Sequence, residues 1–429
     1  MAEAVARPTP AAAEPIAAPT GTFASLRIRS FRTLFVGTTL SNFAMWLQQV
    51  TMTWLVYDIT NSGAMIGLVN LARSMATMGF APVSGVLIDA VQRRTLMLGT
   101  AFWMLMLSLV LGFVLVAGKE ALWMLFVFSF LGGVAQAVDL PLRQTAVFMF
   151  VPRAFAANAV ALIQTGWGLM RSLGPAIGGF LILWFGAGGN FLIQAVAYGL
   201  VMLNTLALVF PAQPSATGPR QNMFRNMADG VRYVRHEPET RAFLMMGWVL
   251  PLLIIPIYIA LPPIFVKEVY GGGADTLGLL LAAVGVGGIF GGLVAASLGR
   301  VDRRGAVQLV ALAFLALSLI LFALTATFAV ALAFFAASGF FEMIFLTSNQ
   351  TLLQLSIPDE LRGRVTSLVT LNMGLAPLGA LYAGAAADWF GPEPVAVALS
   401  AGALVVAIGS FAFSRTIREY RISAHIGER

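Results

Sequence analysis

The sequence predicts an all-α membrane protein with twelve transmembrane helices in two pseudo-symmetric six-helix bundles. Three observations predict this class: the composition, a series of apolar segments of bilayer length, and the confinement of arginine to one side of them. Of the 429 residues, 59% are hydrophobic and only 10% are charged, whereas soluble proteins carry charge on about a quarter of their residues. Water is therefore not the main solvent of this chain.

The apolar segments predict helical spans. A helix needs about twenty apolar residues to cross the hydrocarbon core, and only helices or closed barrels satisfy the backbone in lipid. The segments are too long for barrel strands. The predicted spans fall into two sets of six, at 33–57, 65–88, 95–117, 121–148, 158–184 and 190–210, and then at 243–266, 275–298, 306–327, 329–355, 365–390 and 395–414.

An internal repeat supports this division. Arg-Gln-Thr at 143–145, followed by Val-Pro at 151–152, recurs as Asn-Gln-Thr at 349–351, followed by Ile-Pro at 357–358. Two similar bundles with a shared site at their interface near mid-membrane are implied. The predicted segments are a disordered tail, the N-terminal bundle, a linker, the C-terminal bundle and a second tail, at 1–24, 25–210, 211–242, 243–414 and 415–429.

The basic residues predict the orientation, because cytoplasmic loops hold an excess of Lys and Arg. If the amino terminus is cytoplasmic, the predicted outer loops contain only Lys119 and Lys267 of the 26 basic residues, and Arg73, Arg143 and Arg171 lie within spans. All others are cytoplasmic. We therefore expect an inner-membrane protein with both termini in the cytoplasm.

Charged residues inside spans are unfavourable in lipid and are candidates for function. Arg171 and Glu342 each lie about thirteen residues into a span, near the midplane but in opposite halves. We hypothesise that Glu342 carries the proton. Burial raises the pKa of a carboxyl and a nearby cation lowers it, so the substrate or a nearby arginine could switch its charge. The alternative is a static structural pairing of each residue with a neighbour.

Three further charges lie closer to the membrane surfaces. Arg73 is in the outer third of the second span, and Asp139 and Arg143 are toward the cytoplasmic end of the fourth. All three are candidates for a substrate or proton pathway. Snorkelling would also explain them, and Asp139 and Arg143, four residues apart, would pair with each other on one helix face.

Polar stripes mark the faces that would line a wet cavity. On the first span, spacings of four, three and four residues align Asn42, Trp46, Gln49 and Thr53. Gln164 shares a face with Arg171, and Asn349 shares one with Glu342. Interhelical hydrogen bonds would produce the same pattern.

Two motifs carry a family resemblance. The first lies at the cytoplasmic end of the second span and consists of Gly85, Asp89, Arg93 and Arg94. It resembles motif A of the major facilitator superfamily, which implies a cytoplasmic latch in the outward-facing state. The basic pair recurs as Arg303 and Arg304 after the eighth span. A plain cytoplasmic loop with a carboxylate at a helix end is the alternative.

The second motif lies in the fifth span and consists of Gly174, Pro175, Gly178 and Gly179. It resembles motif C of the exporter branches of the superfamily, in which spans 5 and 8 pack across the two halves. The expected partners on span 8 are Gly287, Gly288, Gly291 and Gly292. Generic helix packing by small residues is the alternative. The four prolines of span 7, including Pro251 and Pro256, predict a bent helix.

From about residue 25 to 414 the chain resembles this superfamily, most closely its bacterial drug and siderophore exporters. The resemblance implies a secondary active efflux transporter of small amphipathic molecules, with a proton gradient as the energy source. Low charge in the cavity favours uncharged or weakly charged substrates. The expected partners are the substrate and the lipid bilayer, without nucleic acid, and the expected state is a monomer. An uptake carrier for a small metabolite and a non-transporting membrane receptor remain alternatives.

The sequence offers no sign of enzyme chemistry, and we expect no cofactor and no metal. The chain has no cysteine and only two histidines, His236 and His425, both in polar segments. It also has no phosphate-binding loop, which argues against an ATP-driven pump within this chain.

Overall fold

The computed structural model describes residues 21–210, 231–298, 301–358 and 372–420, together with 361, 365 and 368. These residues form helices and contain no strand. The long helices of the N-terminal half are α1 Arg29–Thr60, α2 Gly63–Ala90, α3 Arg93–Val116, α4 Leu122–Phe150 and α5 Ala156–Leu206. Short 3₁₀ turns precede α1 and α5, at η1 Ala24–Arg27 and η2 Arg153–Phe155.

The C-terminal half begins with a helical segment that changes type several times: α7 Pro238–Val249, the π-helix η3 Leu250–Ile254, α8 Ile255–Ile259, α9 Pro262–Ile264 and the π-helix η4 Phe265–Val269. It continues with α10 Ala274–Ser297, α11 Arg304–Ala323, α12 Phe328–Leu355, α14 Asn372–Phe390, α15 Pro392–Phe413 and α16 Arg415–Arg418. The prolines of the first segment remove backbone donors, which explains its irregular helix. The structure thus shows an irregular helix in span 7, where the prolines predict a bend.

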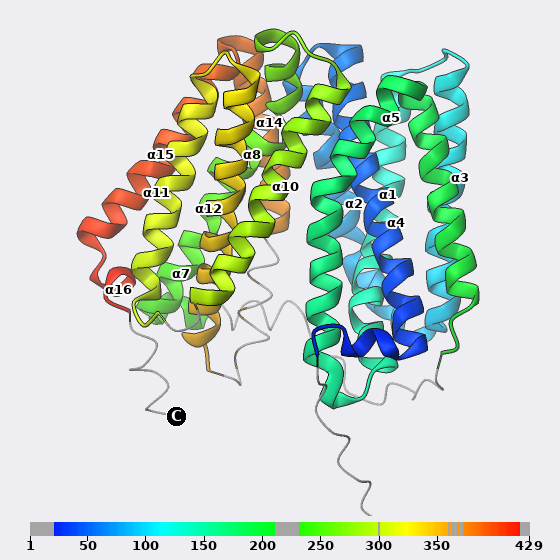
Figure 1. The fold of residues 1–429 in the computed structure, drawn as a ribbon, viewed down its shortest axis with the longest axis horizontal. Coiled ribbons are helices and arrows are strands. Elements are labelled where there is room, and N and C mark those ends of the chain that lie inside the picture. Colours follow the sequence, from blue (N-terminus) through cyan, green and yellow to red (C-terminus); the bar gives the residue numbers. More distant parts are fainter. Residues whose placement is uncertain are drawn as a thin grey trace, which may run out of the picture.

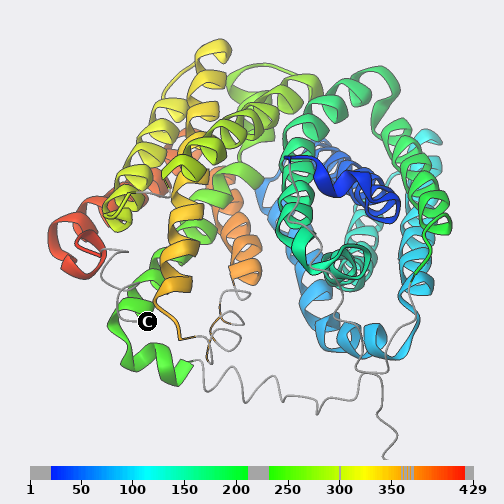
Figure 2. The ribbon, with the colours of Figure 1, turned by 60° about the horizontal axis from the view of Figure 1, so that its bottom comes forward.

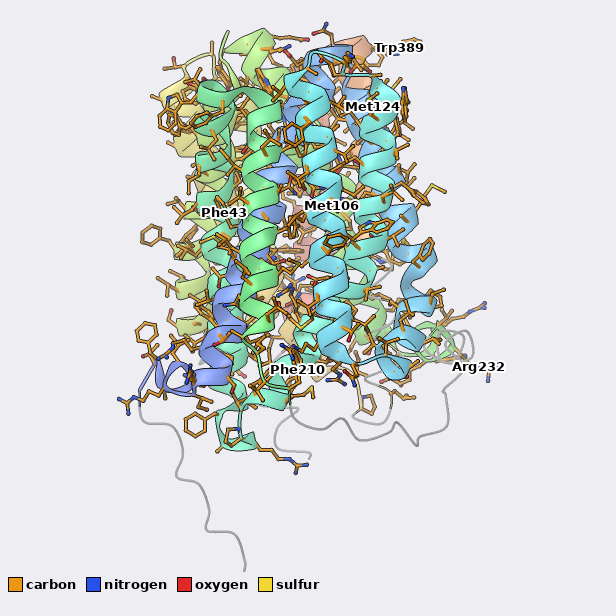
Figure 3. The ribbon with its side chains drawn as sticks, turned by 90° about the vertical axis from the view of Figure 1, so that its right-hand side faces the viewer. Phe43, Met106, Met124, Phe210, Arg232 and Trp389 are labelled. Atoms are coloured by element: carbon orange, nitrogen blue, oxygen red, sulfur yellow. The ribbon has the colours of Figure 1, made fainter. Side chains whose placement is uncertain are left out.

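Figure 1 shows the elements η1 to α5 on one side of the molecule and α7 to α16 on the other. Seen from below, the same two groups lie next to each other (Figure 2). We call them the N-half and the C-half. Both η1 and α16 lie at the same end of the long helices, which we call the terminal end, and the opposite end is the far end. Figure 3 places Arg232 at the terminal end and Trp389 at the far end.

Within the described residues, nine helical segments are long and apolar enough to cross a membrane. One of them, Arg153–Leu206, has 54 residues and contains a break at Gly186, where φ is 69° and ψ is 174°. The predicted loop between spans 5 and 6 is thus reduced to one residue with a backbone conformation that only glycine readily adopts. The outer surface carries many exposed apolar side chains, including Phe113, Trp123 and Val405, as expected for lipid contact.

Several predicted boundaries differ. α7 begins at Pro238, inside the segment predicted as a linker, because proline suits the first position of a helix. Parts of the predicted tails and linker, at 1–20, 211–230 and 421–429, lie outside the described residues. The halves meet along two pairs of helices, α2 with α14 and α5 with α10. The site described next lies between these contacts.

Candidate functional site

An ion pair joins the two halves near the middle of the helices. Arg171 of α5 donates from Nη2 to both carboxylate oxygens of Glu342 of α12, at 3.1 and 2.8 Å. Both side chains are largely buried, with exposed fractions of 17% and 8%. The two residues chosen by their depth in the spans are therefore brought into direct contact.

Aromatic rings surround this pair. The guanidinium of Arg171 lies 5.8 Å from the ring centroid of Trp167, which meets the ring of Trp46 edge-on at 5.8 Å. On the C-half side, the hydroxyl of Tyr258 donates to Ser338 Oγ at 2.9 Å, one helical turn from Glu342. This combination of charge, aromatic faces and hydroxyl groups can bind a molecule with both apolar and polar parts.

The predicted alternative for Asp139 and Arg143 describes their observed geometry. Arg143 Nε donates to Asp139 Oδ2 at 2.6 Å within α4, and Thr100 of α3 donates to the other carboxylate oxygen at 2.9 Å. This ion pair lies entirely within the N-half. In the described part of the chain, no hydrogen bond or ion pair joins it to the Arg171–Glu342 pair.

Arg73 of α2 differs from the other interior charges. Its Nη2 donates to Asn70 Oδ1 of the same helix at 3.4 Å, and no carboxylate in the described part of the chain pairs with it. The side chain is partly exposed and borders a small cavity with Gln48, Gln49 and Ser129. The free energy of inserting an arginine at the centre of a membrane helix is unfavourable by about 2.5–3.5 kcal/mol. An arginine without a counter-ion at this depth is therefore a candidate for a functional role.

The polar stripe of α1 divides between two roles. Gln49 donates to Thr53 at 3.3 Å, and Trp46 packs against α5 at Gly174. Asn42 is partly exposed and has no partner among the described residues. Gln164 is exposed on α5. Asn349 is instead buried and accepts a hydrogen bond from Gln308 of α11 at 2.8 Å, which is the interhelical alternative.

Sequence reasoning missed the buried polar contacts inside the N-half. Gln194 donates to Gln48 at 2.8 Å, and Asn190 donates to Thr51 at 2.6 Å, joining α1 to the second part of α5. The spacing of Gln48 and Thr51, three residues apart on α1, indicates this second polar face, which adjoins the predicted face through Gln49.

The glycines of the fifth-span motif form tight contacts. A Cβ at Gly174 would lie 2.5 Å from Trp46 Cβ, and one at Gly178 would lie 2.5 Å from Val50 Cγ1, both on α1. A Cβ at Gly179 would lie 2.5 Å from the carbonyl oxygen of Ala274 on α10. Pro175 lies inside the same helix and is buried. The motif therefore packs against both halves.

The expected partners on α10 were wrong. The glycines of α10 that face α5 are Gly278, next to Pro175 and Gly179, and Gly285, next to Ser172. Gly287 and Gly291 face α12 instead, while Gly288 and Gly292 have looser surroundings. α10 carries glycine on two faces, and residue spacing identifies a face without identifying its neighbour.

The first motif lies open at the terminal end. Gly85 has no atom within 4 Å of a hypothetical Cβ, and Asp89 is exposed without a bonded partner among the described residues. Arg93 contacts the sulfur of Met149 at 2.8 Å and Arg94 donates to the Leu206 carbonyl at 2.7 Å, both within the N-half. In the C-half, Arg303 is exposed, and Arg304 is buried and donates to the Ala295 carbonyl at 3.1 Å.

At the far end, by contrast, polar contacts join the halves. Asp388 of α14 accepts from Ser62 Oγ at 2.6 Å and from the backbone N–H groups of Gly63 and Ala64 at 2.6 and 3.1 Å. A carboxylate thus caps the N-terminus of α2, where it complements the unpaired N–H groups and the helix dipole.

Two further contacts close the same end. Lys267 donates to Asp58 at 2.6 Å, and Tyr57 donates to Glu268 at 2.6 Å. Each joins α1 of the N-half to η4 of the C-half. Together with Asp388 they form what we call the far-end latch.

We expect Asp388→Ala to weaken closure of the far end by about 1 kcal/mol, which changes the ratio of closed to open molecules about fivefold. Because the chain has no cysteine, spin labels can be placed on cysteines at positions 120 and 326, in far-end loops of the two halves. The distance distribution should shift toward longer values. Glu393→Gln, an exposed acid at the same end, is the control, and an unchanged distribution in D388A would contradict the latch.

Comparison with known proteins places these features in a family. A sequence model of the family described as transmembrane secretion effector matches residues 20–423. The staphyloferrin A transporter of Staphylococcus aureus is 24% identical over 353 residues, covering 81% of this chain and 86% of that protein. The multidrug efflux pump Tap of Mycolicibacterium fortuitum is 24% identical, covering 84% and 89%.

The enterobactin exporter EntS of Escherichia coli is 25% identical over 391 residues, covering 88% of this chain and 90% of that protein. Among solved structures, the bacterial homologue of the human lysosomal transporter Spinster has a TM-score of 0.69 at 16% identity, covering 92% of this chain and 98% of that one. This structural likeness concerns the fold alone.

Proposed function

The chain belongs to the major facilitator superfamily, in the family of transmembrane secretion effectors, and on this premise we propose that it is a proton-coupled efflux transporter of small amphipathic molecules. The family consists of transporters and not enzymes. The chain is accordingly a multi-pass inner-membrane transporter with a small-molecule substrate. The observation that carries the proposal is the buried Arg171–Glu342 pair between the two halves.

The proposal includes twelve spans in two six-helix bundles. Nine segments meet the length and hydropathy criteria, and the break at Gly186 divides the longest of them into two helices. α1 and α14 are the remaining two, since each runs with its neighbours between the terminal and far ends (Figure 1). We assign the terminal end to the cytoplasm, because the arginine-rich segments lie there.

Alternating access is supported by the uneven contacts between the halves. The far-end latch and the close approach of α2 to α14 at Gly63 and Gly384 hold the far end together. At the terminal end, Asp89 and Arg94 form no hydrogen bond or ion pair with the described part of the C-half, and Arg94 donates instead to Leu206 of its own half. We interpret this arrangement as the state that is open to the cytoplasm, in which the first motif has released its latch.

Proton coupling is assigned to Glu342. The Glu342 carboxylate accepts both hydrogen bonds from Arg171 across the two halves, so a proton carried on this group would alter a contact between α5 and α12. Binding of a proton and binding of the substrate would thus alter the same contact. Export, a monomeric state and the absence of any cofactor are part of the proposal, and the direction is supported by the names of the relatives and by the packing of the fifth-span motif.

The test is transport into inside-out membrane vesicles with an acidic interior. An exporter driven by proton antiport should accumulate a substrate drawn from a panel of a catecholate siderophore, a hydroxycarboxylate siderophore, a macrolide and a cationic dye. A protonophore should abolish the accumulation. Accumulation only in right-side-out vesicles would identify an uptake carrier, and specific binding without transport in either orientation would identify a receptor.

A further inference from the structure

We propose that Arg73 is an anion site, which binds a carboxylate or a related oxyanion of the transported molecule. The inference rests on the proposed function for the existence of an amphipathic substrate, and it adds the charge that this substrate carries. It replaces the expectation from composition that the substrate is uncharged or weakly charged.

The first argument is the charge balance inside the helices. In the described part of the chain, five charged side chains lie at least seven residues from either end of their helix: Arg73, Asp139, Arg143, Arg171 and Glu342. Four of them form the two ion pairs within α4 and between α5 and α12. Arg73 alone has no described counter-ion, and a cation within the membrane is unfavourable without one.

The second argument is the hydrogen-bonding capacity around Arg73. A guanidinium has five N–H donors in a planar fork that matches two carboxylate oxygens, and Arg73 donates to the Asn70 amide oxygen at 3.4 Å. The adjoining cavity of about 10 Å³ is bordered by the side chains of Gln48, Gln49, Asn70 and Ser129. It has room for a group about the size of one water molecule, such as a carboxylate oxygen.

The third argument is the position of Arg73 relative to the central site. Gln49, which borders the cavity, lies one helical turn from Trp46 on α1. Trp46 contacts Trp167, and Trp167 lies against Arg171. A molecule with its apolar part against the two indoles would therefore have Arg73 about one turn further toward the far end.

The experiment compares two dansyl compounds that differ in one charge. Dansylglycine carries a carboxylate, whereas dansylglycinamide is neutral and nearly the same size. Binding to the purified full-length protein is measured by energy transfer from tryptophan to the dansyl group. We expect wild type to bind dansylglycine about tenfold more tightly than the amide. This ratio should fall to near one in Arg73→Gln and be largely retained in Arg73→Lys.

Several outcomes separate the inference from the proposed function. Equal affinity of the wild type for the two compounds, or a carboxylate preference that survives in Arg73→Gln, would overturn the anion site alone. Binding of neither compound to the wild type would overturn the anion site, and the efflux function would still be decided by the vesicle assay. A preference that depends on Arg73, combined with no transport in vesicles, would leave the anion site standing and overturn the efflux function. Thermal unfolding confirms that each variant is folded.

Discussion

Replacing Glu342 with alanine should destabilise the protein by about 3–5 kcal/mol, because it leaves the Arg171 guanidinium buried without its counter-ion. The partner of Arg171 in the structure is this carboxylate, at 2.8 Å, and removing one member of a buried pair is more harmful than replacing both. The double variant Arg171→Met with Glu342→Leu should therefore recover most of the lost stability while remaining inactive. Unfolding in detergent, monitored by tryptophan fluorescence, measures the stability.

The neutral variant Glu342→Gln separates stability from coupling. Its amide oxygen can still accept a hydrogen bond from Arg171, so the protein should fold, bind the substrate and exchange it across the membrane without a gradient. Accumulation driven by the proton gradient should be lost. Full proton-driven accumulation in this variant would remove Glu342 from the proton pathway and leave the pair with a structural role only.

Gly179→Leu should abolish transport by preventing the close contact of α5 with α10. A Cβ at this position would lie 2.5 Å from the Ala274 carbonyl oxygen and 2.9 Å from Gly278 Cα. Both are backbone atoms, which a side-chain rotation cannot move, so the two halves must separate. Overpacking of this kind costs about 1–3 kcal/mol, and it would fall on the surface where α5 meets α10.

The matched control is Gly99→Leu on α3, whose main contacts are with α4 and α5 of the same half. No atom lies within 4 Å of a Cβ at Gly99, and leucine has a higher helix propensity than glycine by up to about 1 kcal/mol. This variant should keep wild-type stability and transport. If both variants behave alike in the vesicle assay, the α5–α10 contact is not the feature that limits transport.

The fold class and the main charged residues could be predicted because they depend on one-dimensional properties. Segment length and hydropathy identify spans, and the distance of Arg171 and Glu342 from the span ends gives their depth. The pairing between them could not be predicted, since it depends on how two distant helices approach. The same holds for Asp388, which caps α2 of the other half.

Errors arose where two helix faces compete. On α1, the spacing predicts a polar face through Gln49, whereas the buried partner of Gln194 is Gln48, one residue and about 100° away. On α10, Gly278 and Gly285 face α5, whereas the predicted Gly287 and Gly291 face α12. A periodic pattern shows that a face is special, and only the packed structure shows what meets it.

The break at Gly186 has a consequence for how positions in this protein should be ranked. No atom lies within 4 Å of a Cβ at Gly186, so steric space alone would allow a larger residue at this position. Its backbone angles, 69° and 174°, are closed to residues with a side chain. The backbone torsion φ of Gly186, and not the space around it, therefore limits which residues this position tolerates.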